Sequence, residues 1–395
     1  MKFLLCNARL ILTPGEEILH GWLLVEEGMI KAIGSLDEEL AGCDNVIDCD
    51  GDYLAPGLVD IHCHGAVGRD AMEAMPEAFD KILNYHASCG TTALVLTTVA
   101  ASLPEMLAVL GCAQGYRSVM GMDSSRLVGI HLEGPYFSPH RMGAHRAEML
   151  RHPSPEETSG LLNYATLIRR MTIAPELPGA LDLIRELRRN GITVSAGHSD
   201  ATEDEALAGF NTGISQVTHL HNAMSSLRKT APNPRRGLAE VALETPGIVC
   251  ELIADGVHVA PELLREAWLV KGWKEIVLVS DATAGAGLAE GEEFGLGGLS
   301  CCVQGGAAWA ETRAGEETER KLAGSTATLF DGIRTMVESV GVPLEEAVAM
   351  ATLVPAKTLG LEQTLGSLAQ GKAANLIRFN GRWEIKGVWI GGRGR

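Results

Sequence analysis

Six histidine and carboxylate residues stand at the ends of short apolar runs, at widely separated points of the chain. They are His62, His64, Glu133, His198, His219 and Asp281. Imidazole nitrogens and carboxylate oxygens are ligands that suit both Zn²⁺ and Fe²⁺, and a carboxylate such as Glu133 can bridge two ions. A single histidine at a strand end is usually satisfied by its local neighbours. Six coincident positions instead favour a site for divalent metal, with one or two ions.

The first of these runs, LVDIHCHG, carries two of the six residues. His62 and His64 are two residues apart, so a β-strand points both to the same face. Cys63 lies between them and faces the other way, which predicts a packing role. His131 precedes Glu133 by two residues and shares its face one layer deeper. It is either a partner of a metal ligand or part of the filling of a barrel.

The strands and helices that must bring these residues together alternate regularly from Tyr53 onward. Apolar strand-like runs alternate with longer helical stretches, which predicts βα units and a parallel sheet. Eight runs occur, the number that closes a (β/α)₈ TIM-type barrel, whose active sites lie at its C-terminal mouth. The runs are LVDIHCHG, TALVLTTV, RLVGIHLEG, MTIAPE, ITVSAGHS, QVTHLHN, VCELIADGVHV and EIVLVSDA.

Both ends of the chain carry shorter apolar segments broken by glycine and proline, as in β-hairpins. We therefore predict a small β-sandwich-like domain built from residues 1–55 and 360–395, and an α/β barrel built from residues 56–359. The length of 395 residues agrees with one large domain and one small domain.

Composition narrows the class of protein. The net charge of −17 disfavours a nucleic-acid surface, because phosphate backbones attract basic patches. No apolar run of about 18 residues or more occurs, so we expect no membrane segment. The nine cysteines are scattered without a CxxC pair, which favours free thiols in a reducing, cytoplasmic setting.

Motifs along the whole chain resemble those of the N-acetylglucosamine-6-phosphate deacetylases, a family within the amidohydrolase superfamily. They are APGLVDIHCHG, GIHLEGPYFSP, GAH, TIAPE, SAGHSDA, THLHNAM, ADGVHV, VSDAT, LAGS and VPAKTLGL with GSLAQGKAANL. The HxH pair is shared by the whole superfamily, whereas the ordered set of EGP, GAH, HNAM and ADGVHV is more specific to the deacetylases. Residues 291–321 resemble a variable loop of the family and predict no chemistry.

The resemblance implies a metal centre with two parts. Glu133, His198 and His219 correspond to ligands of the metal that these enzymes always hold. His62 and His64 match members with a second metal. The resemblance therefore favours a centre able to hold two divalent ions, either Zn²⁺ or Fe²⁺.

The resemblance also implies a reaction, the hydrolysis of the acetamide of N-acetylglucosamine-6-phosphate to acetate and glucosamine-6-phosphate. The metal would lower the pKa of a bound water from near 16 toward about 7 and so supply the attacking hydroxide. Asp281 would act as general base and then as general acid toward the leaving amine. His145, from the GAH motif, would stabilise the developing oxyanion together with the metal.

Substrate recognition in this family implies three further residues. Asn222 and the backbone of Ala223, both in HNAM, would bind the sugar. His258, in ADGVHV, would contact the phosphate. Members of the family also form homodimers in which an arginine of the neighbouring subunit reaches the phosphate, from the segment that follows HNAM.

That segment departs from the family pattern, because SSLRKTAPNPRRGL is longer than the usual stretch. Arg235 or Arg236 is the best candidate for the donated arginine, with Arg228 and Lys229 as alternatives. A planar, permanently charged guanidinium suits bidentate phosphate binding. His221 stands where relatives often carry an aromatic residue, and it either lines the rim of the pocket or has no role.

Three other functions fit parts of the pattern. A sister enzyme acting on N-acetylgalactosamine-6-phosphate would share every motif. Cyclic amidases commonly use a carboxylated lysine on the fourth strand, and MTIAPE offers none. A non-catalytic phosphosugar sensor would be expected to have lost Asp281 or a metal ligand, and none is missing.

Overall fold

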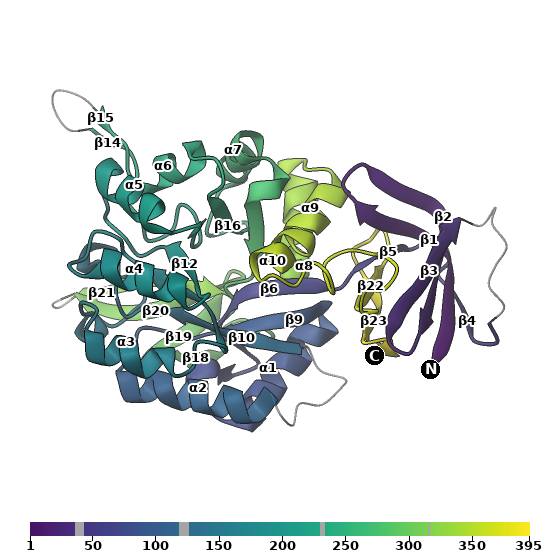
Figure 1. Ribbon diagram of the computed structural model, residues 1–395, viewed down its shortest axis with the longest axis horizontal. Helices are drawn as coiled ribbons and strands as arrows, with labels where there is room; N and C mark the ends of the chain where they lie inside the picture. Colours follow the sequence, from purple (N-terminus) through teal and green to yellow (C-terminus); the bar gives the residue numbers. More distant parts are fainter. Residues whose placement is uncertain (36–42, 118–125, 230–233, 315–316) are drawn as a thin grey trace.

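The computed structural model describes residues 1–35, 43–117, 126–229, 234–314 and 317–395. Its centre is a parallel sheet of eight strands in the order β17-β16-β13-β12-β11-β10-β9-β6 (Figure 1). A parallel bridge between Cys63 and Ala282, and a 3.0 Å hydrogen bond from Asp281 N–H to His62 O, join the last strand to the first. The sheet therefore closes into the predicted (β/α)₈ barrel.

Each barrel strand overlaps one of the eight apolar runs of the sequence. The strands are β6 (Leu58–Cys63), β9 (Thr91–Thr97), β10 (Arg126–Glu133), β11 (Ile168–Ile173), β12 (Thr193–Ala196), β13 (Gln216–Val217), β16 (Val249–Ile253) and β17 (Ile276–Val279). Almost all of their residues are buried on both faces, as expected of a parallel sheet covered by helices.

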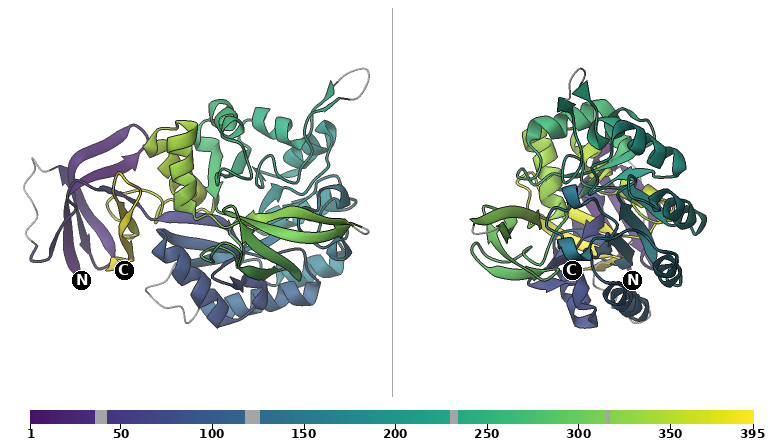
Figure 2. Two further views of the ribbon diagram at one scale, coloured as in Figure 1. Left: turned by 180° about the vertical axis from the view of Figure 1, so that it is seen from behind. Right: turned by 90° about the vertical axis from the view of Figure 1, so that its left-hand side faces the viewer.

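A helix follows each barrel strand and lies on the outside of the barrel (Figure 2). Local sequence explains where these helices begin and which face they bury. Thr202 and Glu205 form a capping box at the start of α5, and α4 buries Leu183, Ile184 and Leu187 on one face. The helices are α1 (Pro76–Ser88), α2 (Leu103–Arg117), α3 (Pro155–Leu162), α4 (Ala180–Arg189), α5 (Glu203–Thr212), α6 (Leu238–Glu244), α7 (Pro261–Lys271) and α8 (Leu329–Thr335), with α9 (Leu344–Met350) and α10 (Leu353–Thr358) after them.

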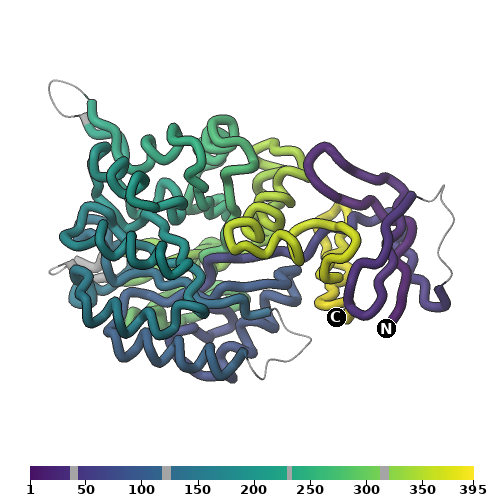
Figure 3. Tube along the Cα trace, viewed as in Figure 1, coloured from purple at the N-terminus to yellow at the C-terminus, as the bar shows by residue number. Residues whose placement is uncertain are grey.

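The two ends of the chain build a second sheet beside the barrel (Figure 3). Its strand order is β24-β23-β22-β5-β1-β2-β3, with β4 beside β1. Strand β5 pairs antiparallel with β22, so the N-terminal and C-terminal segments share one sheet, as predicted. The strands are β1 (Lys2–Thr13), β2 (Glu16–Glu26), β3 (Met29–Ser35), β4 (Val46–Asp48), β5 (Tyr53–Pro56), β22 (Leu376–Phe379), β23 (Ile385–Ile390) and β24 (Arg393–Gly394).

The predicted domain boundaries lie close to the passage between the two sheets. Residue 55 lies within β5, directly before the first barrel strand, and residue 360 follows α10. The division into two domains at these points stays a prediction.

Residues after β17 form an antiparallel insert that the sequence did not reveal. Its strands are β18 (Glu293–Leu296), β19 (Leu299–Gln304), β20 (Ala307–Ala314) and β21 (Glu317–Ser325), paired in chain order. The insert lies along one side of the barrel (Figure 2). It has its own small apolar cluster, which includes Phe294 and Val303.

Two expectations from composition concern the chain as a whole. All nine cysteines are free thiols. Within the described ranges, no helix combines the length and the apolar character needed to cross a bilayer.

Candidate metal centre

The six predicted metal-site residues meet at the C-terminal mouth of the barrel. Each lies at the end of its strand or within two residues after it: His62 and His64 at β6, Glu133 at β10, His198 at β12, His219 at β13 and Asp281 at β17. Each is at most 6% exposed. His198, His219 and Asp281 have φ angles of 48°, 32° and 47°. Positive φ is uncommon outside glycine and gathers at functional sites, so these strand-end turns support a functional role.

Three of these residues point ligand atoms at one another. Glu133 Oε1 lies 3.3 Å from His198 Nε2 and 3.1 Å from His219 Nε2, and the two Nε2 atoms are 3.0 Å apart. The Nδ1–H of His198 donates to the carbonyl oxygen of Arg141 at 3.0 Å, which leaves its Nε2 lone pair free for a cation. Burial lowers the pKa of His198 to about 4, so its imidazole is neutral at pH 7. This triangle fits a divalent metal ion.

The other oxygen of Glu133 faces a second group of donors. Glu133 Oε2 lies 3.2 Å from His64 Nε2, and Asp281 Oδ1 lies 3.2 Å from both His64 Nε2 and His62 Nε2. His62 Nε2 is fully buried and makes no hydrogen bond with the described residues. An orphaned nitrogen among carboxylate oxygens is the environment that a second cation would complete.

The carboxylates of the site are held in their charged form. Burial raises the pKa of Asp281, but the charges of His62 and His64 outweigh burial and lower it to about 2. Burial also raises the pKa of Glu133, and the neighbouring histidines, His62 first, bring it well below its usual value. Both side chains are therefore anionic at neutral pH and able to bind a cation.

His131 lies one layer beneath the site, where two threonines hold its ring. Its Nδ1 contacts Thr97 Oγ1 at 3.2 Å and its Nε2 contacts Thr172 Oγ1 at 2.7 Å. Its ring packs edge-on against His62, with 4.7 Å between the ring centroids. Burial lowers the pKa of His131 well below its usual range, so it is a neutral support beneath a candidate ligand.

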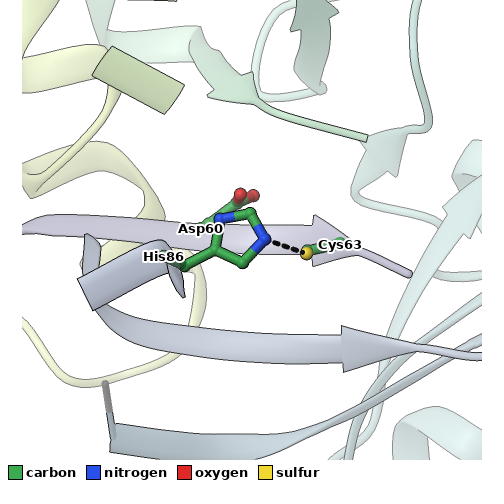
Figure 4. Close-up of side chains that lie close together, drawn as sticks. All are labelled: Asp60, Cys63 and His86. Carbon is green, nitrogen blue, oxygen red and sulfur yellow. Dashed lines mark hydrogen bonds between the residues drawn. The ribbon is translucent and has the colours of Figure 1, made fainter. Parts of the chain in front are cut away.

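Cys63 and Asp60 lie on β6 with His62, and their contacts stabilise this strand (Figure 4). Cys63 Sγ lies 3.1 Å from His86 Nε2, which also lies 3.1 Å from the carbonyl oxygen of Gly65. Asp60 Oδ1 accepts a hydrogen bond from the backbone N–H of His62 at 3.2 Å. These contacts fix the strand that carries the HxH pair, and Cys63 packs as expected.

A cavity of about 390 Å³ opens above these ligand atoms. It brings together nine of the residues predicted from the sequence: His64, Glu133, His145, His198, His219, Asn222, Ala223, His258 and Asp281. His62 lies directly beneath, fully buried. His221 is half-buried and is not among the described residues that line this cavity.

Two further histidines line the cavity, His145 and His258, and a contact at Nδ1 orients each ring. The backbone N–H of Ala100 donates to His145 Nδ1 at 3.2 Å, so the neutral ring carries its proton on Nε2, which lies 3.6 Å from Glu133 Oε2. His258 Nδ1 lies 2.7 Å from Asp255 Oδ2. Burial lowers the pKa of His258, but Asp255 outweighs burial and raises it, which favours a cationic ring.

The candidate arginines lie away from the cavity of their own chain. Arg235 is exposed on β15 (Pro234–Arg235), which pairs with β14 (Arg228–Lys229). Arg236 forms ion pairs with Glu203 and Glu244. Arg228 forms an ion pair with Asp200. Their contact with the phosphate of a neighbouring subunit stays a prediction.

Sequence analysis missed two sets of residues at the site. The insert supplies part of the cavity wall, including Leu296, Gly297 and Lys321. Arg170 and Glu251 lie beneath the site and are each 1% exposed. A signal exists for Glu251, which is a charged residue inside the apolar run VCELI, whereas Arg170 directly precedes the run MTIAPE and stands beside Arg169.

Comparison with known proteins agrees with this geometry. The sequence model of the Amidohydrolase family matches residues 53–394. The N-acetylglucosamine-6-phosphate deacetylase of Vibrio furnissii is 34% identical over 388 residues, which cover 96% of this chain and 93% of that protein. The N-acetylgalactosamine-6-phosphate deacetylase of Escherichia coli O157:H7 is 34% identical over 389 residues, which cover 98% of both chains.

Solved structures show the same likeness along the whole chain. The N-acetylglucosamine-6-phosphate deacetylase of Pasteurella multocida superposes with a TM-score of 0.91 at 29% identity and covers 100% of both chains. A variant of the Mycobacterium smegmatis enzyme in complex with N-acetyl-D-glucosamine-6-phosphate has a TM-score of 0.88 at 32% identity, covering 100% of this chain and 99% of that one. The protein therefore belongs to the amidohydrolase family, is a hydrolase that acts on an amide, and by its family requires a divalent metal ion.

Proposed function

We propose that this enzyme removes the acetyl group of N-acetylglucosamine-6-phosphate and releases glucosamine-6-phosphate and acetate. The observation that carries the proposal is the arrangement at one cavity of the Glu133, His198 and His219 triangle with Asp281 and His145 beside it. The full-length likeness to deacetylases of amino-sugar phosphates supplies the substrate class.

Glu133, His198 and His219 would hold one Zn²⁺ or Fe²⁺ ion, and His62 and His64 would hold a second, with Glu133 between them. The neutral His198 imidazole and the ionised carboxylates described above suit both metals, and a histidine that binds a metal does so in its neutral form. A divalent cation in such a centre supplies Lewis acidity that activates water and polarises a carbonyl group.

Asp281 and His145 would carry the proton and charge steps. Asp281 is ionised and lines the cavity, so it is able to take a proton from water and pass it to the leaving amine. His145 carries a proton on Nε2 toward the same point and would donate a hydrogen bond to the acyl oxygen as negative charge develops there.

His258, Asn222 and the backbone of Ala223 would bind the sugar phosphate. Asp255 stabilises the charged form of His258, which would offer its Nε2–H to an anion. The remaining phosphate charge would be met by Arg235 or Arg236 of a neighbouring subunit in a homodimer. Size-exclusion chromatography tests this last part, because a fully active monomer would remove it.

The galacto epimer is the second candidate substrate, because the relatives named for the two epimers are equally similar at 34% identity. We therefore propose an acetate-release assay with N-acetylglucosamine-6-phosphate, its galacto epimer and the unphosphorylated sugar. Turnover highest on the phosphorylated gluco substrate supports the proposal, and a preference for the galacto epimer replaces it with the second candidate. An absence of acetate from all three with metal supplied would reject both.

A further inference from the structure

A buried ion pair spans the floor of the barrel beneath the metal centre. Arg170 on β11 and Glu251 on β16 form this pair, and each side chain is 1% exposed. Strands β12 and β13 separate their two strands in the sheet, so the contact crosses the barrel interior. Burial lowers the pKa of Arg170 to about 9, so its guanidinium stays charged at neutral pH.

Arg170 pairs with Oε1 of Glu251, and the other carboxylate oxygen, Oε2, contacts one residue from each part of the candidate centre. Glu251 Oε2 lies 3.2 Å from His62 Nδ1 and accepts a hydrogen bond from the backbone N–H of His219 at 3.2 Å. The contact with His62 is made by the imidazole ring itself. The contact with His219 is made by the main chain and leaves its ring facing Glu133.

A hydrogen-bond acceptor at Nδ1 of a histidine holds the ring proton on Nδ1 and leaves the lone pair of Nε2 available to a metal ion. When Nδ1–H donates to Glu251, the neutral His62 ring presents a lone pair on Nε2 toward Asp281 and Glu133. Carboxylate–histidine pairs of this kind fix the tautomer and orientation of a metal ligand. His64 has no equivalent support, since its Nδ1 is buried without a hydrogen bond to any described residue.

The ion pair explains how a second carboxylate is tolerated so deep in the barrel. A buried carboxylate is costly unless it is paired. Arg170 occupies one oxygen of Glu251 and leaves the other for His62. Arg170 also lies 3.4 Å from Thr218 Oγ1, next to His219 in the chain, which fixes the guanidinium against the barrel wall.

We propose that Glu251, held by Arg170, is a positioning residue that sets metal occupancy at the His62 and His64 side of the centre. Glu251 makes no hydrogen bond with the ring of His198 or of His219, because the His198 ring is oriented by the carbonyl of Arg141 and the contact with His219 is made by its backbone N–H. This inference rests on the two-ion centre proposed above and not on the identity of the substrate.

The test measures bound Zn²⁺ per chain by elemental analysis and by titration of the apoprotein. The variants are Glu251→Gln, the double variant Arg170→Met with Glu251→Leu, and His62→Gln as the reference for loss of this side. The double variant removes both buried charges together, which is commonly neutral for folding. The matched control is Asp52→Asn, which breaks the 2.6 Å ion pair with Arg378 in the terminal sheet.

We expect wild type and Asp52→Asn to bind two ions. Glu251→Gln and the double variant should keep the tighter ion and bind the second about 10 to 100 times more weakly, and His62→Gln should weaken the same ion. If the folded Glu251 variants bind two ions with unchanged affinity, the role of Glu251 is overturned and the two-ion centre stands. A single ion in wild type would overturn the two-ion centre and the inference with it. Loss of both ions together from a folded variant would also contradict the inference.

Discussion

The barrel mouth and the terminal sheet bury opposite kinds of side chain. The terminal sheet closes over apolar residues such as Phe3, Leu23 and Trp389. Burial of such surface stabilises a fold by about 25 cal/mol for each Å². The barrel mouth instead buries Glu133 and Glu251, at 2% and 1% exposure, in a region where burial of charge opposes folding.

This difference assigns separate tasks to the two regions. A core built only for stability has no need of Glu133, Asp281 and three histidines within a few ångströms of one another. Such a cluster repels itself in part and leaves buried nitrogens without hydrogen bonds. We therefore expect changes at the mouth to remove metal and activity, and changes in the terminal sheet to reduce stability alone.

The largest effect should come from Glu133→Gln, which removes the charge shared by both parts of the centre. We expect metal content to fall and turnover of the phosphorylated substrate to drop by roughly 10³-fold or more, because the loss of a Lewis acid costs several kcal/mol in the transition state. Elemental analysis and acetate release measure the two effects. Activity within tenfold of wild type, with both ions bound, would contradict the role of Glu133.

Asp281→Asn should act on the reaction more than on the metal. The amide keeps the shape of the side chain but cannot take a proton, so kcat should fall by roughly 10² to 10⁴-fold. The thermal midpoint and the ion held by Glu133, His198 and His219 serve as controls and should change little. A kcat near that of wild type would remove Asp281 as the proton carrier.

His258→Asn should weaken binding of the phosphorylated substrate and change its pH dependence. Asp255 raises the pKa of His258, so the charged ring and its contribution to binding are present at low pH and are lost as pH rises through that raised value. Loss of a charged hydrogen bond of about 1.5 kcal/mol should raise KM about tenfold at a pH low enough for the ring to be charged. The unphosphorylated sugar is the control, and an equal rise in its KM would argue against a phosphate contact.

Leu23→Ala should have the smallest effect on activity and should act on stability. Leu23 is fully buried in the terminal sheet, so its truncation should cost about 2 to 5 kcal/mol of unfolding free energy. Denaturant unfolding measures the loss, and kcat and metal content should be unchanged at 25 °C. A variant that is folded but depleted of metal would show that the two regions are not separate in function.

The sequence predicted the barrel because its strands are buried on both faces and stand out as apolar runs. It also predicted which residues share the cavity, because strand ends of one barrel meet at one mouth. The short strand β13, Gln216–Val217, was correctly located as well, since it opens the run QVTHLHN that carries His219.

Other features depended on contacts that spacing does not encode. The insert from Glu293 to Ser325 alternates weakly and was assigned no chemistry, yet it supplies Lys321 to the cavity wall. The pairing of Arg170 with Glu251 requires the closed barrel, because their strands are not neighbours. The local ion pairs of Arg236 likewise could not be read from the segment that carries it.

The most direct test of metal-dependent deacetylation is one assay in three states. Acetate release from N-acetylglucosamine-6-phosphate is measured on the purified enzyme, after removal of metal by a chelator, and after return of Zn²⁺ or Fe²⁺. We predict turnover that is lost on chelation and restored by the metal. Turnover that persists in enzyme shown by elemental analysis to be free of metal would contradict the account.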